Sequence, residues 1–354
     1  MKQDEEIIIV GGGLSGLMLA SLLLEKNIKA TILEASPRIG GRMQTLQGKN
    51  NTPLELGATW LQGVHTHIIS TLKALGIQKF QQFSEGKSLF QPNPYSPIQE
   101  FFVPQNEASS YRIEGGSENL IHTLKSKLKS EQVILNAKVN AIREDGHKLI
   151  VETVTNETYQ ANKVVLCLPP QLVGSQISFS PSLPQELTAL FPTVQTWMGG
   201  SIKYVIEYKR PFWRENGFSG MFYSNSGIIA EMYDHTNIDK TKFGFTGFLN
   251  PGAKAYTQEE RKKFVLQQLE EILGQKATQP LLYEDKIWTD EFILDGNPVL
   301  EYPHQNNGHL LLQHQYMNRK LFFGGTEVSP IYSGYMEGAI IAAKNCFEKL
   351  VDSK

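Results

Sequence analysis

Residues 7–42, IIIVGGGLSGLMLASLLLEKNIKATILEASPRIGGR, decide the fold. The run Ile7-Ile8-Ile9-Val10 is continuously apolar, as expected of a parallel strand that is buried on both faces. It stops at a glycine cluster in which Gly11, Gly13 and Gly16 have the G-x-G-x-x-G spacing. In that motif the first glycine makes a tight turn, the second admits a pyrophosphate against the backbone, and the third allows close packing of helix on strand.

A helix is predicted to follow from near Leu14 to Lys26, and a second strand from Ala30 to Leu33. The unpaired N–H groups at the start of such a helix, that of Ser15 among them, bind phosphate. The second strand delivers Glu34 to the place where this motif needs a carboxylate for the ribose hydroxyls, and a carboxylate there disfavours a 2′-phosphate. The stretch therefore predicts a dinucleotide-binding βαβ unit.

The competing interpretation is a signal peptide or membrane span, because residues 7–24 carry no charge. Three consecutive glycines would break a membrane helix, and the preceding Asp4-Glu5-Glu6 is acidic where a signal peptide is positive. Both features favour the nucleotide-binding unit.

The end of the stretch shows which dinucleotide is expected. Glu34-Ala35, followed by Gly40-Gly41-Arg42, resembles the FAD fingerprint of the flavin-containing amine oxidases, the family of monoamine, polyamine and L-amino-acid oxidases. The resemblance implies FAD as cofactor and places Arg42 at its pyrophosphate, for which a planar guanidinium is suited.

A second segment, Gly57-Ala58-Thr59-Trp60, resembles the part of these enzymes whose backbone lines the flavin. Polyamine oxidases have a histidine two residues after the tryptophan, whereas this chain has Gln62. His65 and His67 lie just beyond, but without a nearby carboxylate or cysteine they make a poor metal site, and no metal is expected.

Lys203 stands in a segment, Ser201 to Tyr208, whose alternation predicts a half-buried strand with the lysine facing solvent. Its context, which continues into Pro211-Phe212-Trp213, closely resembles monoamine oxidases. In these enzymes the lysine holds a water against flavin N5, which implies that Lys203 assists oxygen reduction.

The C-terminal part carries the strongest resemblance after the N-terminus. It implies FAD contacts from Gly325, Glu327, Gly334, Tyr335 and Met336, and it places Tyr335 against the substrate amine. The resemblance also implies that Val139, which lies in a predicted hairpin, contacts the adenine. The alternative is a C-terminal core helix with incidental aromatic residues.

Two departures from the family stand out. The segment Asp295-Gly296-Asn297-Pro298 replaces the region with the covalent flavin cysteine and the first tyrosine of an aromatic cage, so FAD should bind noncovalently and Tyr302 is the candidate substitute. Residues 80–105 read as connecting structure with one or two strands. The long helical excursion of larger members before Gly115-Gly116 is missing, which predicts a trimmed substrate domain and a more open active site.

Composition sets broad limits. The chain has 354 residues and a formal net charge of −2, which removes any electrostatic argument for nucleic acid or an anionic membrane. Cys167 and Cys346 are the only cysteines, so a reducing, cytoplasmic compartment is expected. The final segment from Glu337 reads as an amphipathic helix without a hydrophobic tail, so no membrane anchor is expected, and the oligomeric state is open.

The predicted fold is α/β, α+β overall, with a Rossmann-like FAD-binding domain (1–79, 106–190 and 294–354) interleaved with a mixed-sheet substrate-binding domain (80–105 and 191–293). The implied function is an FAD-dependent amine oxidase with Lys203 and Tyr335 as catalytic residues. Hydride passes from the amine carbon to flavin N5, the imine hydrolyses, and O2 reoxidises the flavin to give H2O2. A flavin desaturase or protoporphyrinogen-type oxidase, and a flavoprotein without turnover, remain alternatives.

Overall fold

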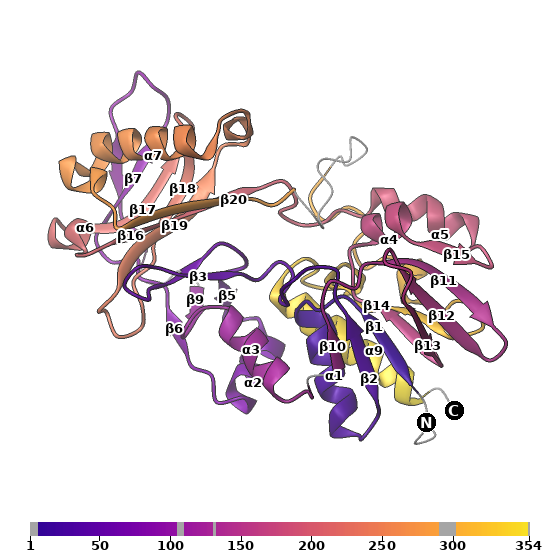
Figure 1. Ribbon diagram of the computed structural model, residues 1–354. Coiled ribbons are helices and arrows are strands. Elements are labelled where there is room, and N and C mark those ends of the chain that lie inside the picture. Colours follow the sequence, from indigo (N-terminus) through magenta and orange to yellow (C-terminus); the bar gives the residue numbers. More distant parts are fainter. Residues whose placement is uncertain (1–5, 105–109, 130–131, 290–301, 353–354) are drawn as a thin grey trace.

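A computed structural model describes residues 6–104, 110–129, 132–289 and 302–352. Its two lobes are each built around a large sheet, and both termini lie at the far end of one lobe (Figure 1). The segment Asp295 to Pro298 and the domain boundaries predicted at 105/106 and 293/294 lie outside the described residues.

The lobe with the termini contains a five-stranded parallel sheet, as the apolar run at its centre predicts. Its strands, in spatial order, are β10 (Val133–Ile134), β2 (Ala30–Leu33), β1 (Ile7–Val10), β14 (Lys163–Leu166) and β21 (Leu321–Phe323). The two predicted strands of the βαβ unit are confirmed.

Both faces of this sheet are covered. Ile7 and Ile9 pack among helices, whereas Ile8 and Val10 pack against a second sheet, which explains why β1 is apolar at every position. The helices of the first side are α1 (Leu14–Glu25), α2 (Thr66–Ala74), α3 (Glu118–Ser126) and α9 (Met336–Asp352). The other side has β11 (Val139–Asp145), β12 (Lys148–Thr153), β13 (Thr158–Ala161) and β15 (Ser178–Ser180), with α4 (Pro170–Gln176) and α5 (Gln185–Leu190).

The second lobe is a seven-stranded mixed sheet in which only β17 and β7 run parallel. Its strands, in spatial order, are β20 (Leu282–Ile287), β16 (Ile202–Tyr208), β19 (Phe243–Leu249), β18 (Ile229–Asp234), β17 (Phe218–Ser224), β7 (Lys87–Gln91) and β8 (Gln99–Phe101). Strands from before residue 105 and after residue 201 thus share one sheet, as the interleaved topology requires.

Helix α7 (Gln258–Leu273) covers one face of the mixed sheet (Figure 1). Its start is the expected capping box, because Thr257 Oγ1 accepts from the Glu260 N–H at 3.3 Å and Glu260 Oε2 accepts from the Thr257 N–H at 2.8 Å. Gly274, with φ of 82°, follows the last turn. The short α6 (Phe212–Glu215) follows β16 along the chain.

The expectation of a half-buried strand at 201–208 is wrong, because all seven residues of β16 are buried. The opposite face of β16 is covered by the hairpin of β3 (Thr45–Gln47) and β4 (Pro53–Glu55) and the turn between them. Glu207 caps that turn by accepting from the N–H groups of Lys49 at 2.7 Å and Asn50 at 3.1 Å. A polar position in an alternating pattern can therefore face another part of the chain rather than water.

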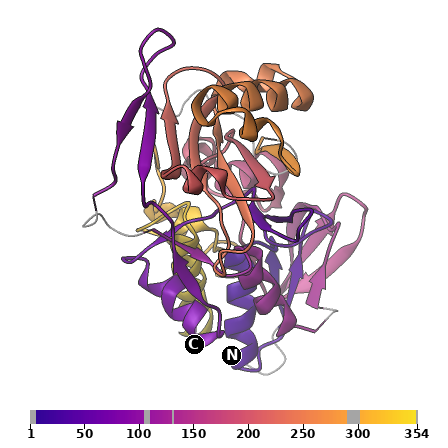
Figure 2. The same cartoon turned by 90° about the vertical axis from the view of Figure 1, so that its left-hand side faces the viewer.

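Within the predicted connecting segment, residues 87–101 form the edge hairpin of β7 and β8, which projects from the sheet in Figure 2. Together with α2 and a small sheet, this hairpin connects Trp60 to Gly115. The small sheet contains β5 (Leu61–Gln62), β9 (Ser110–Ile113) and β6 (Lys79–Gln81). The other short helices are α8 (Leu310–Gln313) and the 3₁₀ turns η2 (Phe191–Thr193), η3 (Pro251–Ala255), η4 (Gln275–Thr278) and η5 (Thr326–Val328). Within the described ranges, no helix has the length and apolar character needed to cross a bilayer.

Candidate active site

The glycine loop between β1 and α1 has the geometry that its spacing predicts. Gly11 has φ of 109°, and a Cβ on it would lie 2.7 Å from the Cys167 carbonyl oxygen. A Cβ on Gly16 would lie 2.1 Å from the Gly11 carbonyl oxygen, so α1 and β1 approach closely only with glycine here. At Gly13 the nearest atom to an added Cβ is 3.9 Å away, which leaves the backbone accessible to a ligand.

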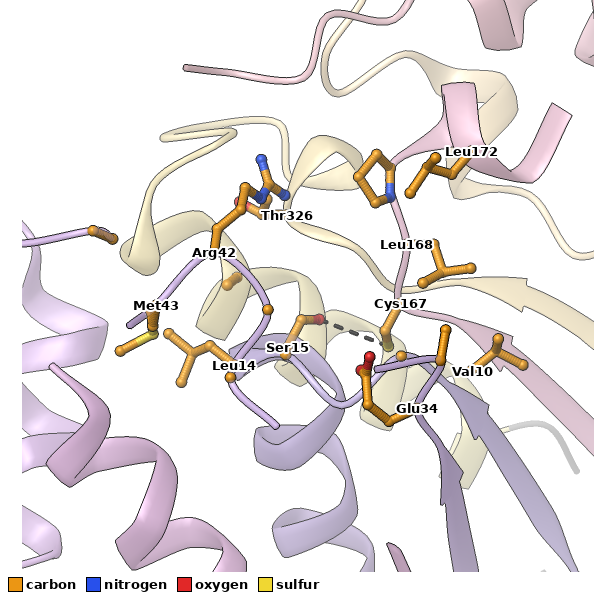
Figure 3. A pocket seen from close by; sticks show the side chains of 18 of the residues that line it. Val10, Leu14, Ser15, Glu34, Arg42, Met43, Cys167, Leu168, Leu172 and Thr326 are labelled. Atoms are coloured by element: carbon orange, nitrogen blue, oxygen red, sulfur yellow. Dashed lines mark hydrogen bonds between the residues drawn. The ribbon is translucent and has the colours of Figure 1, made fainter. Parts of the chain in front are cut away.

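Helix α1 has no side-chain cap at its N-terminus. The first N–H groups of a helix have no intrahelical partner, and they open here beside the cavity that Leu14 and Ser15 line. Ser15 Oγ donates to the Gly324 carbonyl and lies 3.8 Å from Cys167 Sγ (Figure 3). This helix end is therefore available to an anion.

Glu34 is held at the end of β2 by two backbone donors. Its Oε2 accepts from the Gly12 N–H at 2.6 Å and its Oε1 from the Ser36 N–H at 2.9 Å. Each carboxylate oxygen can accept a further hydrogen bond. The carboxylate thus lies at the cavity in a fixed orientation, as ribose binding requires.

Arg42 and Glu327 form an ion pair with 2.7 Å between Nη1 and Oε1. Glu327 is completely buried, and within the described part of the chain neither of its carboxylate oxygens has a hydrogen-bond donor with good geometry. Buried acceptors without donors are costly, so a ligand with hydroxyl groups would satisfy them. Figure 3 shows Arg42 beside Thr326 on one side of the cavity and Glu34 beside Val10 on the other.

The cavity measures about 1290 Å³, counting the part open to solvent. Residues of both large sheets line it, from Val10 on β1 to Lys286 on β20. An anion site at α1, a carboxylate for ribose and buried acceptors at Glu327 together fit FAD.

The structure brings most of the predicted cofactor residues to this cavity. Those that line it are Gly11, Gly13, Leu14, Ser15, Glu34, Ala35, Gly41, Arg42, Ala58, Val139, Gly334, Tyr335 and Met336. The other predicted cofactor residues do not line the cavity. They are Gly16, Gly57, Thr59, Trp60, Gly325 and Glu327.

Lys203 is buried, and its Nζ donates to the Gly57 carbonyl and to Thr59 Oγ1. Nζ also lies 4.9 Å from the centroid of the Trp60 ring. Burial lowers the pKa of the Lys203 ammonium to about 7, and the charge of Glu55 opposes that shift. The strand alternation alone would place this lysine toward solvent, whereas its side chain binds the segment that the resemblance assigns to the flavin.

Glu55 was not anticipated from the sequence. Burial raises the pKa of its carboxyl group, which is opposed by the charge of Lys203 and by hydrogen bonds from Ser117 and Thr45. Thr45 pairs with it across the β3–β4 hairpin, but Ser117 and Lys203 come from distant parts of the chain, so no local pattern could have indicated its burial beside the lysine.

Tyr335, which is 38% exposed, has three ring neighbours that the sequence did not indicate, namely His65, Trp197 and His304. Its ring centroid is 5.9 Å from Trp197 and 5.7 Å from His304, and those two rings stack at 4.2 Å. The Nδ1 atom of His304 is buried without a partner among the described residues. Tyr302, the expected substitute for the missing cage tyrosine, is 57% exposed.

Other lining residues were not predicted as site residues, among them Trp288, Lys286 and Cys167. Trp288 is buried and donates from Nε1 to the Leu56 carbonyl at 2.7 Å, and Lys286 Nζ lies 4.4 Å from its ring centroid. Cys167 follows the end of β14, and burial raises the pKa of its thiol to about 12. The thiolate is therefore disfavoured, so Cys167 is a poor nucleophile.

A parallel sheet, a glycine loop and an acidic strand end around one elongated cavity define a dinucleotide-binding protein with a Rossmann-like domain. The chain belongs to the family of flavin containing amine oxidoreductases, whose model matches residues 14–95 and 96–346. It is thus an FAD-dependent oxidoreductase of the class that acts on CH–NH2 or CH–NH groups.

The sequences of named relatives align with almost the whole chain. The probable flavin-containing monoamine oxidase A of Dictyostelium discoideum is 25% identical over 458 aligned residues, which cover 99% of each chain. Amine oxidase B of Mus musculus is 26% identical over 459 residues, covering 99% of this chain and 87% of that protein. Both aligned lengths exceed the 354 residues here, so these relatives contain segments that this chain lacks.

Solved structures show the same fold. A putrescine oxidase with putrescine bound has a TM-score of 0.83 at 21% identity, covering 98% of this chain and 99% of its own. Cyclohexylamine oxidase from Brevibacterium oxydans IH-35A has a TM-score of 0.82 at 19% identity, covering 98% and 100%.

Proposed function

We propose that this chain is an amine oxidase that uses noncovalently bound FAD. Bound FAD would supply N5 as acceptor for the hydride that leaves the carbon of a neutral amine, with O2 as the final oxidant, which is reduced to H2O2. The imine product hydrolyses in water. The observation that carries the proposal is the position of the buried Lys203 side chain. Its Nζ donates to Gly57 and Thr59, on either side of Ala58, which lines the cavity.

The cavity lining supports the binding roles that the family resemblance implies. The N-terminus of α1 and the Arg42 guanidinium bind the pyrophosphate, and Glu34 accepts from the ribose hydroxyls. Val139 contacts the adenine, and Glu327 accepts from the ribityl hydroxyls. The segment Gly334 to Met336 and the N-terminus of α9 lie at the flavin pyrimidine, where a helix dipole favours negative charge.

Two side chains carry the catalytic roles. The Lys203 ammonium holds a water at N5 and stabilises the negative charge that develops during oxygen reduction. The aromatic face of Tyr335, supported by Trp197 and His304, orients the lone pair of the amine. No side-chain nucleophile is required.

We also propose that FAD is bound noncovalently and that the compartment is reducing and cytoplasmic. The free state of both cysteines supports these proposals. Both are free thiols, and Cys346 is buried in α9 while Cys167 lies beside Ser15 at the phosphate end of the cavity. We retain the proposed division into an FAD domain (1–79, 106–190, 294–354) and a substrate domain (80–105, 191–293), which the two separate large sheets support.

The test is anaerobic mixing of the FAD-loaded protein with primary and secondary amines, polyamines and L-amino acids, followed by admission of air. Bleaching of the flavin absorption by one amine class, reversed by air with H2O2 formed, is the expected result. Absence of bleaching by every amine would contradict the proposal in favour of carbon–carbon desaturation or cofactor binding without turnover.

Arg42→Met should lower FAD affinity about ten- to a hundredfold, because it removes the pyrophosphate ligand and leaves the Glu327 carboxylate buried without its cation. Titration of apoprotein with FAD, followed by quenching of flavin fluorescence, measures the dissociation constant. Arg143→Met is the control, since Arg143 forms an exposed ion pair with Glu152 on the β11–β12 hairpin. Equal affinities in the two variants would remove Arg42 from the cofactor site.

A further inference from the structure

A second cavity lies between β4, β9 and the turn that follows β18. Glu55, Arg112 and His235 line it, and each of these three residues is at most 4% exposed. A water molecule fits inside, because about 10 Å³ is open to the centre of a water-sized sphere. The residues that line this space do not line the cofactor cavity. We call it the polar cavity.

Two side chains of the polar cavity each have a buried atom without a partner. Among the described residues, neither Arg112 Nε nor His235 Nδ1 has a hydrogen-bond partner. The Arg112 guanidinium is held in place by Nη2, which donates to the Thr236 carbonyl, and by the Phe80 ring, whose centroid is 4.6 Å away. Buried polar groups are rarely left unpaired, so these two atoms indicate a bound water.

The chemistry of the two atoms suits one water. Burial and the charges of Arg112 and Lys203 lower the pKa of His235, so its imidazole is neutral. A hydrogen bond to the backbone of Pro53, which has a carbonyl but no N–H, places the imidazole proton on Nε2 and leaves Nδ1 as acceptor. A water can therefore accept from Arg112 Nε and donate one hydrogen to His235 Nδ1.

Glu55 offers an acceptor for the second hydrogen of this water. Its carboxylate accepts from the N–H and the hydroxyl of Ser117 and from Thr45 Oγ1 at 3.1 Å. An ionised carboxylate has about four acceptor positions, so one remains. The polar cavity thus provides one donor and two acceptors, which is a complete set of partners for one water.

Lys203 is a buried cation whose direct ligands are neutral. Its Nζ donates to the Gly57 carbonyl and to Thr59 Oγ1, and within the described ranges no carboxylate forms an ion pair with it. On the neighbouring strands, Phe248 and a second lysine, Lys286, are directly opposite Lys203. A buried ammonium in such surroundings needs a carboxylate nearby to stay charged.

The fold brings Glu55 to this place. Val205, two residues after Lys203 on the same face of β16, packs with Leu54 and Leu56, the residues on either side of Glu55. The β3–β4 hairpin therefore lies along β16 with Glu55 next to the start of the segment that binds the lysine.

The charges around the polar cavity leave Glu55 as the counter-charge of two cations. Burial disfavours the charged forms of Lys203 and Arg112, and the charge of Glu55 favours both. Asp234 also acts on Arg112, but its carboxylate is bonded by Arg214 through Nε at 2.7 Å and Nη2 at 2.8 Å. Loss of the Glu55 charge would therefore affect Lys203 directly.

We propose that Glu55 is a positioning residue for oxygen reduction: its carboxylate, which shares a bound water with Arg112 and His235, keeps the Lys203 side chain in the charged form. The inference rests on the proposed function and names the group on which the role of Lys203 depends. Lys203 acts on the oxygen, whereas Glu55 acts only through Lys203.

The test is the pH dependence of reoxidation by O2 after photochemical reduction of the bound flavin, which requires no amine. The wild-type rate constant should fall as the pH rises through about 7. Glu55→Gln should move the midpoint of this fall to lower pH by at least about one unit, because loss of the negative charge disfavours the ammonium. Below both midpoints, the rate of the variant should approach that of the wild type.

Glu207→Gln is the matched control. Glu207 is also a buried carboxylate of β16 that bonds the β3–β4 hairpin, but it accepts from the turn at Lys49 and Asn50. Its loss should disturb the hairpin and leave the midpoint unchanged, whereas Glu55→Asp, which keeps the charge, should restore most of the shift. An unmoved midpoint in Glu55→Gln, or an equal shift in Glu207→Gln, would overturn the proposal.

The wild-type protein provides a readout that does not depend on the folding of a variant. A crystal structure that resolves ordered water should show one water bonded to Arg112 Nε, His235 Nδ1 and the Glu55 carboxylate. An empty polar cavity, or a water without a bond to Glu55, would contradict the proposal. Failure of every amine to bleach the flavin would contradict the proposed function instead, and it would leave both of these tests intact.

Discussion

Lys203→Met is expected to slow reoxidation by O2 about a hundred- to a thousandfold, which is the usual loss when one preorganised charge stabiliser is removed. Anaerobic reduction by amine should change far less, because the lysine does not contact the amine in the proposed mechanism. Stopped-flow absorbance measures both half-reactions separately. The methionine retains the apolar stem but loses the cation that binds the Gly57 carbonyl and Thr59.

The same lysine predicts the pH dependence of reoxidation. Burial lowers the pKa of Lys203 to about 7, so the side chain is cationic below that pH and becomes neutral as the pH rises through it. The rate constant with O2 should therefore fall as the pH rises through about 7, and the Lys203→Met variant should lack this dependence. A wild-type rate that rises over this interval would contradict a cationic role.

Lys163→Met is the matched control for loss of a buried lysine. Lys163 lies on β14 and donates to the Leu350 carbonyl at 3.3 Å, close to the C-terminal end of α9. This variant should retain wild-type oxygen kinetics even where its stability falls. Unchanged reoxidation in Lys203→Met would remove the role assigned to that residue.

The parts of the site that the sequence predicted are those in which one short stretch contains both the element and the ligand-binding group. Residues 7–42 form a self-contained unit that contains β1, the glycine loop, α1 and Glu34. The spacing within this stretch alone therefore defines its geometry. The capping box of α7 was predictable for the same reason, because its two partners are three residues apart.

The parts that were missed depend on contacts between distant segments. Glu55 affects Lys203 across 148 positions of sequence, and the Tyr335 ring meets Trp197 and His304 from two other segments. Phe248 lies beside Lys203 only because β19 pairs with β16. A period of two shows that two residues share a face, but it does not show which segment covers that face.

Gly16→Ala tests the close packing of α1 on β1. The substitution should both destabilise the apoprotein and abolish tight FAD binding. A Cβ at this position would lie 2.1 Å from the Gly11 carbonyl oxygen and 3.2 Å from Ile9 Cγ2, and a backbone atom cannot rotate away as a side chain can. The helix must move off β1, at a cost on the order of 3 kcal/mol of unfolding free energy. Urea unfolding of the apoprotein measures that cost.

Loss of FAD in this variant has a separate cause, because displacement of α1 moves the N–H groups that bind the pyrophosphate. We expect FAD affinity to fall at least about tenfold beyond what the lower fraction of folded protein explains. Gly252→Ala is the matched control, since an added Cβ there has no neighbour within 4 Å and should leave both quantities unchanged. Wild-type stability in Gly16→Ala would mean that the contact between helix and strand does not require glycine. Wild-type FAD affinity in a destabilised variant would instead show that the first turn of α1 does not bind the pyrophosphate.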